Sequence, residues 1–333
     1  MSVANSAQRN VLLLYNVDST WTPEDALDCQ QHVERLADGM RGVGHGVDLV
    51  EVRQDVVAPL HGRDPREAII FNWCEGLDGQ PNAYDIVTRT LDELGFAYTG
   101  SGPWALAHTQ NKAVTKHVLD QLGISTPRWR VFTNTRAADE WTVFPAIVKP
   151  VAEHCSYGIT ADSVVDDAAG LRRQIELIME KYGVGALAEE FIIGREINAS
   201  IWGNGAPYVL PLYEIMFTDI EDPRRQVVDF DAKWAIDSFQ YNHTPSHCPA
   251  ELDEPLAGRI RATALAAYRA LRCRDYGRID MRVRDGVPYV VDVNANCDIT
   301  IDGGFAKTAQ VAGYNYGAMA SQIVQWASKR MPA

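Results

Sequence analysis

Two short alternating segments near the C-terminal end carry the residues best suited to chemistry. GRIDMRV places Arg278 and Asp280 two residues apart, and YVVDVN does the same for Asp292 and Asn294. Side chains two apart on a strand share a face, so each segment presents its polar pair on one side. Carboxylate and amide oxygens suit Mg²⁺, which commonly takes one or two carboxylates together with substrate phosphates. The alternative for this segment alone is a solvated hairpin edge on which Asp and Arg pair.

The loop between the two segments decides whether their polar pairs meet. Asp285-Gly286 favours a two-residue hairpin turn, but the register of that turn sends Asp292 to the face away from Asp280. A three-residue loop centred on the glycine instead sets Asp280 opposite Asp292 and Arg278 opposite Asn294. We predict the three-residue loop, because it also keeps the apolar residues of both strands on one face.

Two lysines lie where an ammonium group can reach a phosphate. Lys149 ends the apolar strand FPAIVKP, and Lys112 lies in the first turn of a helix expected from about Thr109 to Leu122. The adjoining loop EHCSYG, which contains Ser156, can supply backbone N–H donors. Lys112 alone could equally be a solvated helix charge, whereas a strand-end charge such as Lys149 beside a small-residue loop needs a partner.

Three glutamates lie at or beyond the end of the next predicted strand, ALAEEF. Glu189 and Glu190 end the strand, and Glu196 lies beyond a turn at Gly194. Carboxylates can accept hydrogen bonds from an adenine amino group or from ribose hydroxyls. Taken singly, each of the three is more often a surface acid.

The elements that must position these residues indicate an α/β fold. VLLLY (11–15) is typical of a buried strand, and Thr22 and Pro23 begin a helix. Further strands are expected near 47–52 and 68–72. This strand–helix–strand order favours a parallel sheet with helices on its faces. No G-x-G-x-x-G follows the first strand, which argues against a dinucleotide site.

The remaining elements follow a turn signal, YTGSGP (98–103), that marks a candidate domain boundary. Residues 216–250 are polar, interrupted by prolines and aperiodic, and a loop of this length is usually functional or mobile. We expect further strands at 144–150, 186–191 and in EINASIW, and further helices at 167–182, 253–272 and 315–329.

Composition and charge argue against several classes of protein. The 333 residues are 46% hydrophobic and 23% charged, as in ordinary globular proteins. No apolar run is long enough to cross a bilayer, and the opening MSVANSAQRN lacks a signal peptide's apolar core, so we expect a cytoplasmic protein with no membrane partner. The net charge of −13 argues against a nucleic-acid partner. Six scattered cysteines without a C-x-x-C pair predict free thiols.

Four motifs, taken in order, resemble the D-alanine–D-alanine ligase branch of the ATP-grasp superfamily from about residue 70 onward. They are YTGSGPWALAHTQNKAVTKHVLDQLGISTPRW, FPAIVKPVAEHCSYG, AEEFIIGREINASI and GRIDMRV…YVVDVNAN. The resemblance implies a homodimer whose chain has an N-terminal α/β domain (1–100), a central ATP-grasp subdomain (101–188) and a C-terminal ATP-grasp subdomain (189–333). The ATP-grasp part would be α+β, and its C-terminal subdomain would hold the metal and substrate site.

The resemblance also assigns roles residue by residue. The nucleotide-binding residues are Lys112, Lys149, Ser156, Glu189, Phe191, Ile192, Glu196 and Lys233. Among these, Glu189 and the backbone at Phe191 and Ile192 would hold the adenine and Glu196 the ribose. The phosphates would be faced by Lys112, Lys149, Ser156 and Lys233, the last of these from the mobile 216–250 loop. The metal ligands are Asp280, Asp292 and Asn294, for two Mg²⁺ ions that Mn²⁺ can replace.

The implied chemistry is an ATP-dependent joining of a carboxylate to an amine. The carboxylate attacks the γ-phosphorus of ATP to give an acyl phosphate and ADP, and the amine then attacks the acyl carbon and displaces phosphate to form the amide. Arg278 and Lys233 are the catalytic residues that the resemblance implies. Closure of the 216–250 loop would exclude water, which otherwise hydrolyses the intermediate.

The chain departs from the dipeptide-forming members of that family at the substrate end. Asp298 replaces a glycine, and Gly303 stands where a serine binds the acceptor's carboxylate. A carboxylate at 298 repels such an acceptor and favours a cationic or polar one. Asn296 lies close to it in sequence. Glu24 could bind a substrate amine, with helix capping as the favoured alternative, and Glu75 could line the same cleft. We therefore expect a specialised amide-forming ligase acting on an amino-acid-derived substrate.

Three alternatives remain open on the sequence. The first is intramolecular ring closure, in which an amine of the same molecule traps the acyl phosphate. The second is a D-alanine–D-alanine type dipeptide ligase. The third, of another class, is a nucleotide-binding regulatory protein that keeps the fold without turnover.

Overall fold

The computed structural model describes residues 8–332 except 154–155, so part of the predicted phosphate-covering loop EHCSYG lies outside the described residues. The N-terminal sheet is parallel, as predicted, in the order β2-β1-β3. Its strands are β1 (Asn10–Asn16), β2 (Gly46–Val52) and β3 (Ile69–Trp73). Helix α1 (Pro23–Gly42) begins after Thr22, as predicted, and Thr22 and Asp25 form a capping box there. The helices α2 (Val57–Leu60) and α3 (Tyr84–Glu93) follow the second and third strands.

A four-stranded antiparallel sheet in the order β4-β7-β5-β6 forms a second unit. Its strands are β4 (Trp129–Phe132), β5 (Ala146–Pro150), β6 (Val164–Val165) and β7 (Ala186–Glu190). Helix α6 (Ala168–Tyr182) packs on this sheet through Leu171, Ile175 and Ile178. The short helices η1 (Ala138–Glu140) and η2 (Ala161–Ser163) lie in its connections.

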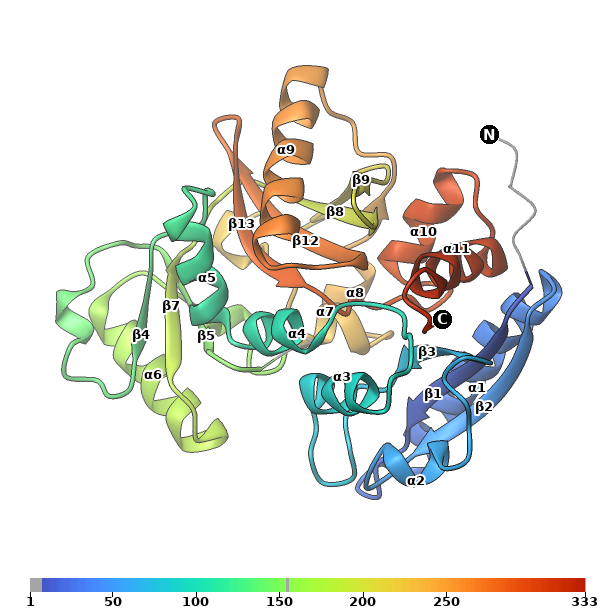
Figure 1. Cartoon of the computed structure of the whole chain (residues 1–333). Coiled ribbons are helices and arrows are strands. Elements are labelled where there is room, and N and C mark those ends of the chain that lie inside the picture. The colour runs from blue at the N-terminus through green and yellow to red at the C-terminus, as the bar shows by residue number, and fades with distance from the viewer. Residues whose placement is uncertain (1–7, 154–155, 333) are drawn as a thin grey trace.

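A third, antiparallel sheet lies between the other two units (Figure 1). It has the order β11-β10-β8-β12-β13, and β9 pairs with β8 off this path. The strands are β8 (Arg195–Gly203), β9 (Tyr208–Val209), β10 (Tyr213–Ile215), β11 (Ser246–His247), β12 (Asp275–Arg284) and β13 (Val287–Asn294). Helix α9 (Glu254–Ala270) covers this sheet, burying Ile260, Ala264 and Ala267 against it. Parallel and antiparallel sheets with helices together confirm the mixed fold class.

The helix predicted from Thr109 to Leu122 is wrong at its start. The chain instead forms α4 (Pro103–Gln110) and α5 (Lys112–Gln121), separated by Asn111. Asn111 adopts an extended conformation, and its side chain accepts hydrogen bonds from the backbone of Ala113 and Val114. An N-cap of this kind begins a new helix, so Lys112 lies at the first position of α5.

The predicted long loop at 216–250 contains short elements. These are η3 (Pro223–Arg225), α7 (Phe230–Trp234) and α8 (Phe239–Asn242), followed by β11 at its end. Helix α10 (Gly304–Val311), which the sequence analysis missed, precedes the predicted α11 (Tyr316–Ser328).

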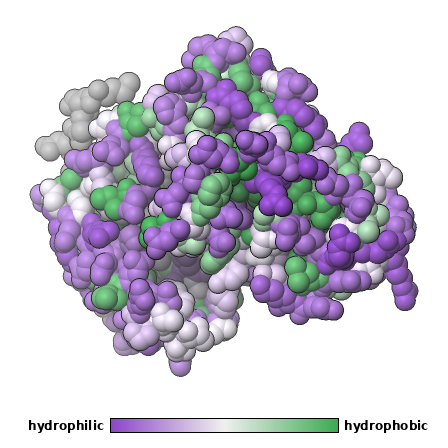
Figure 2. All heavy atoms as spheres, turned by 180° about the vertical axis from the view of Figure 1, so that it is seen from behind, coloured by the Kyte–Doolittle hydropathy of each residue, from purple (hydrophilic) through white to green (hydrophobic). Residues whose placement is uncertain are grey.

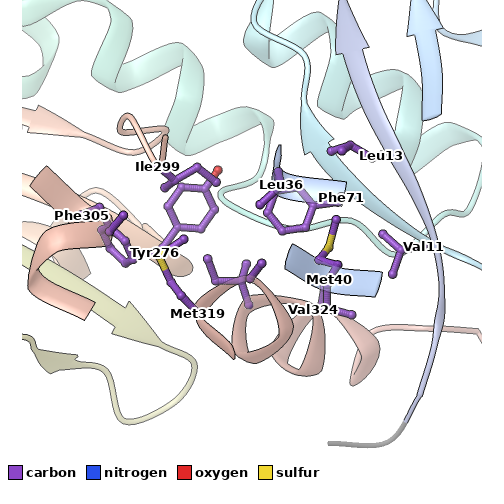
Figure 3. Close-up of a cluster of buried hydrophobic side chains, with 14 of the residues drawn as sticks. Val11, Leu13, Leu36, Met40, Phe71, Tyr276, Ile299, Phe305, Met319 and Val324 are labelled. Carbon is purple, nitrogen blue, oxygen red and sulfur yellow. The ribbon is translucent and has the colours of Figure 1, made fainter. Parts of the chain in front are cut away.

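One hydrophobic core joins the two ends of the chain. Figure 3 shows Leu36, Met40 and Phe71 of the N-terminal part facing Met319 and Val324 of α11. Figure 1 shows α10 and α11 beside the parallel sheet. The C-terminal helices therefore belong to the core of the N-terminal sheet in space, although more than 200 residues separate them in sequence.

The face turned away from Figure 1 is largely hydrophilic, with hydrophobic residues in scattered patches (Figure 2). Among residues 8–332 without 154–155, no helix is long and apolar enough to span a bilayer.

Candidate active site

The β12–β13 hairpin carries the predicted polar face, but by a different route from the one expected. Asp280 pairs with Asp292 and Arg278 with Asn294, as predicted. The three-residue loop is wrong, because Arg284 pairs with Val287 across a two-residue turn. Asp285 and Gly286 both have positive φ angles in that turn, of 52° and 74°.

A β-bulge supplies the missing residue. The register shifts between Asp280 and Met281, so that Met281 pairs with Val290 and Val291 is left without a partner on β12. One extra residue in one strand restores the odd offset between the turn and the polar pairs. The predicted pairs are thus confirmed. The extra residue, however, lies at Val291 of β13 and not in the loop, where it was predicted.

The polar face is tightly hydrogen-bonded. Arg278 donates to both oxygens of Asp280, from Nε at 2.6 Å and Nη2 at 2.8 Å. Asn294 Nδ2 donates to Asp280 Oδ2 at 3.0 Å, which turns its amide oxygen away from that carboxylate. Burial lowers the pKa of Arg278, but Asp280 and the hydroxyl of Tyr213 outweigh that effect and raise it well above its usual value.

A buried chain of charges lies at the end of β7. Both oxygens of Glu189 are ion-paired, with Lys116 Nζ at 2.7 Å and with Lys149 Nζ at 2.9 Å. The glutamate side chain is only 1% exposed. Burial lowers the pKa of Lys149 to about 8, with Asp292 opposing the shift. The carboxylate predicted to meet adenine is therefore already held by two lysines in this arrangement, and its adenine role stays a prediction.

The two predicted phosphate lysines converge on the polar face. Lys112 is buried, and its ammonium group donates to the backbone oxygen of Glu153. The charges that act on Lys149 include those of Lys112, Asp292 and Asp280. Lys112 and Asp292 line one crevice, and charge effects act over short distances, so Lys149 lies near the same groups; this region is the predicted cleft.

The segment after β7, which is predicted to form the adenine slot, is buried. Phe191 and Ile192 are buried, and the backbone N–H of Phe191 donates to Pro145 O at 2.8 Å. Glu196 at the start of β8 pairs with Arg282 of β12 at 3.5 Å. Burial raises the pKa of Glu196, opposed by Arg282.

Arg282 connects this slot to the long 216–250 segment. Its guanidinium lies 5.0 Å from the ring centre of Phe191 and 5.4 Å from that of Phe217. It also donates to the carbonyls of Gly194 and Gln226. The arginine therefore ties the slot, the turn before β8 and the long segment together.

The covering loop and Lys233 also approach the cleft. Ser156, at φ 62°, donates its hydroxyl to Val228 O at 2.9 Å, which ties the loop to the 216–250 segment. Lys233 in α7 is half-buried, and its charge acts on Glu196. Both residues thus lie on the side of the cleft that the long segment covers.

The substrate end gathers acidic groups. Although Glu75 keeps solvent contact, desolvation by its surroundings and the charge of Asp298 raise its pKa to about 7. Asp298 Oδ1 accepts from the backbone and hydroxyl of Thr300 at 2.8 and 2.7 Å. A Cβ added to Gly303 would lie 2.8 Å from Asp298 Oδ2, so a serine at 303 would crowd this aspartate. The two departures from the family pattern are thus sterically coupled.

The other two predicted substrate residues differ in their surroundings. Asn296 Oδ1 accepts a hydrogen bond from the hydroxyl of Tyr276 at 2.8 Å, beside the acidic end. Glu24 is exposed in the first turn of α1, and no contact between described residues joins it to the cleft. Its position favours the alternative of a charge that stabilises the helix N-terminus.

The donors on β12 and β13 fit a hard divalent cation. Asp280 and Asp292 are cross-strand partners, which places their Cβ atoms about 5 Å apart. Within the described ranges, no three His, Cys, Asp or Glu residues gather into a closed metal cage. A cation here would take its other ligands from water and substrate, as Mg²⁺ commonly does.

Lys116 and Arg282 each contact several segments around the site, and neither was predicted from the sequence. Lys116 lies four residues after Lys112 in NKAVTK, which is the spacing of one helix face. Arg282 continues the alternation of Arg278 and Asp280 along one face of β12. Both signals were present, but a single lysine or arginine is usually a surface charge, and only its neighbours in space distinguish it.

Comparison with known proteins gives a consistent result. The family model described as D-ala D-ala ligase C-terminus matches residues 118–325. An uncharacterized protein of Sinorhizobium fredii is 30% identical over 307 residues, 89% of this chain and 88% of that protein. The D-alanine–D-alanine ligase of Desulforamulus reducens is 29% identical over 289 residues, 84% of this chain and 86% of its own.

Solved structures agree with these sequence matches. The D-alanine–D-alanine ligase of Bacillus anthracis superposes with a TM-score of 0.75 at 23% identity, covering 96% of this chain and 98% of that one. The same protein has been solved in complex with ATP, with a TM-score of 0.70. At this identity the likeness establishes the fold.

Proposed function

The chain belongs to the D-alanine–D-alanine ligase family of ATP-grasp proteins, and from that premise we propose an ATP-dependent carboxylate–amine ligase that works through an acyl phosphate. Enzymes of this family are ADP-forming carbon–nitrogen ligases. In this proposal residues 1–100 form the N-terminal α/β domain, residues 101–188 the central ATP-grasp subdomain and residues 189–333 the C-terminal ATP-grasp subdomain. The chain works as a homodimer. The substrates are small molecules, one a carboxylate and the other an amine.

In the first step the lysines neutralise the phosphates. The ammonium groups of Lys112 and Lys149, with the Ser156 loop over them, hold the β- and γ-phosphates while the carboxylate attacks. Mg²⁺ held by Asp280, Asp292 and Asn294 would supply charge neutralisation for the phosphates. Most of the rate gain in such transfers comes from positioning and from neutralised charge, which buried lysines supply without reorganisation.

In the second step Arg278 meets the oxyanion that forms when the amine attacks. Its guanidinium is already oriented by both oxygens of Asp280. Lys233 contributes charge from the 216–250 segment beside the terminal phosphate. Ser156 and Arg282 hold this segment against the cleft, and that supports its role in excluding water.

The acidic end of the cleft selects the acceptor. A free carboxylate on the acceptor would face Glu75 and Asp298, while Gly303 offers no hydroxyl to bind it. We therefore assign to this end an acceptor whose second group is cationic or polar. This favours specialised amide formation over D-alanine dipeptide synthesis.

One observation carries the ligase proposal: Asp280 and Asp292 are cross-strand partners, and their charges act on the buried Lys149. The test is ADP release with ATP and Mg²⁺ across panels of amino-acid carboxylates and amines, including diamines. Asp292→Ala should abolish substrate-dependent ADP release and leave the fold intact. Normal turnover in that variant would remove Asp292 from the mechanism.

Product analysis separates the remaining alternatives. A ligase gives a product with the mass of both substrates minus water, whereas ring closure gives one substrate minus water. ATP binding without ADP release across the panels would favour the regulatory protein. Activity with D-alanine alone would restore the dipeptide ligase.

A further inference from the structure

Lys116 is a buried lysine to which the proposed mechanism gives no task. Its side chain is 2% exposed on α5, one turn after Lys112. The ammonium group contacts three separate parts of the chain, namely Glu189 Oε1 at 2.7 Å, Thr126 Oγ1 at 2.7 Å and Val290 O at 3.5 Å. Burying a lysine without a role is costly, so these contacts call for an explanation.

Val290 lies at the bulge that sets the metal-ligand register. Val291, its neighbour, is the residue without a partner on β12, and Asp292 follows directly. The outer edge of Val290 is held from another segment: its N–H donates to Ser125 O at 2.8 Å, and its carbonyl accepts from Thr126 Oγ1 at 2.8 Å. Lys116 approaches the same carbonyl.

The bulge decides on which face Asp292 lies. With the two-residue turn observed and no extra residue, Asp292 would lie on the face away from Asp280. β-Bulges disrupt the ladder locally, so contacts on the outer edge are what keep such an extra residue in place. The crevice lined by Thr115, Lys116, Leu119 and residues 290–292 has no room for a water molecule that could replace these contacts.

We infer that Lys116 and Thr126 are positioning residues that hold the Val290–Val291 bulge and thereby keep Asp292 beside Asp280. Lys116 also pairs with Glu189, which pairs with Lys149. The same ammonium group therefore fixes the metal-bearing strand relative to the phosphate-binding lysine. The metal part of this inference depends on the proposed function, since it takes Asp292 as a ligand.

The first test measures the strand itself and needs no metal. Thr126→Val removes the hydroxyl that bonds Val290 O, and Thr126→Ser keeps it. Thr88→Val is the control, since Thr88 also donates its hydroxyl to a backbone carbonyl, that of Tyr84, at 2.9 Å in α3, although Thr88 is fully buried and Thr126 only half-buried. Hydrogen exchange of the peptide covering 287–294 should be at least about tenfold faster in Thr126→Val and in Lys116→Met, and unchanged in Thr126→Ser and Thr88→Val. Exchange as slow in Thr126→Val and Lys116→Met as in the two control variants would overturn the inference.

The second test measures Mn²⁺ binding to the full chain in the presence of ADP. Lys116→Met and Thr126→Val should each weaken Mn²⁺ binding roughly tenfold, as the loss of a group that orients a metal ligand typically does. Asp292→Asn is the reference. If Asp292→Asn loses Mn²⁺ and the other two bind it normally, the positioning role is refuted while the metal site stands. If Asp292→Asn also binds normally, the metal site fails, and the exchange experiment alone decides whether Lys116 and Thr126 hold the bulge.

Discussion

Glu189→Gln removes one charge that two buried ammonium groups share, and its effect on stability can be worked out from the structure. The carboxylate oxygens lie 2.7 Å from Lys116 Nζ and 2.9 Å from Lys149 Nζ, and none of the three side chains is more than 8% exposed. Breaking a buried ion pair by removing one partner leaves an uncompensated charge, which costs about 3–5 kcal/mol. Glutamine has nearly the same shape as glutamate, so the loss of stability measures the effect of removing the charge.

Lys149 sets the pH dependence of this loss. Burial lowers its pKa from 10.5 to about 8, which at about 1.4 kcal/mol per pKa unit corresponds to about 3 kcal/mol for keeping it protonated. Because the native pKa is the lower one, the unfolded chain binds more protons between pH 8 and 10.5, and stability rises with pH in that window. Glu189→Gln should therefore lose about 3–5 kcal/mol at pH 7 and less at pH 9, where Lys149 is largely neutral.

Urea unfolding followed by tryptophan fluorescence at both pH values measures this loss. The control is Glu190→Gln, since Glu190 pairs with Arg284 at 2.8 Å while the arginine is 36% exposed. Such an exposed pair is worth about 1 kcal/mol or less. If the free energy of unfolding at pH 7 falls by the same small amount in both variants, the buried lysines do not depend on Glu189 and the reasoning is refuted.

Two further predictions concern binding. Arg282→Met should weaken ATP binding about tenfold, because the guanidinium that packs on Phe191 and Phe217 is lost; calorimetry measures this, and unchanged affinity would contradict the role of Arg282. For a cationic acceptor, KM should fall as the pH rises from about 6 to about 8, because Glu75, whose pKa is raised to about 7, becomes negatively charged. Glu75→Gln should flatten this dependence, and an identical pH profile in that variant would exclude Glu75 from acceptor binding.

Several features could be predicted because they depend on neighbours in sequence. The helix start at Thr22 follows from a local pattern. The parallel sheet of β1, β2 and β3 follows from local patterns and short connections. The alternation along β12 and β13 correctly predicted which side chains share a face. The order of the four motifs was enough to predict the family, which the family model and the relatives confirm.

Other features depend on contacts between distant segments. Lys116 and Lys112 look alike in the sequence, and only the arrival of Glu189 and Val290 beside Lys116 distinguishes the two. Likewise, no local pattern predicts that α11 packs into the core of the N-terminal sheet, since any amphipathic helix could bury its apolar face elsewhere.

The register of the hairpin shows where the two kinds of information meet. By itself the sequence determined that Arg278 and Asp280 share one face of their strand, as do Asp292 and Asn294 of theirs, because side chains alternate along a strand with a fixed period of two. Only the tertiary structure decided that the two pairs meet on the same face, because the extra residue at Val291 is stabilised by Thr126, which lies 164 residues before Val290 in the chain. A backbone irregularity of this kind depends on hydrogen bonds from outside the hairpin, and no pattern within the hairpin encodes them.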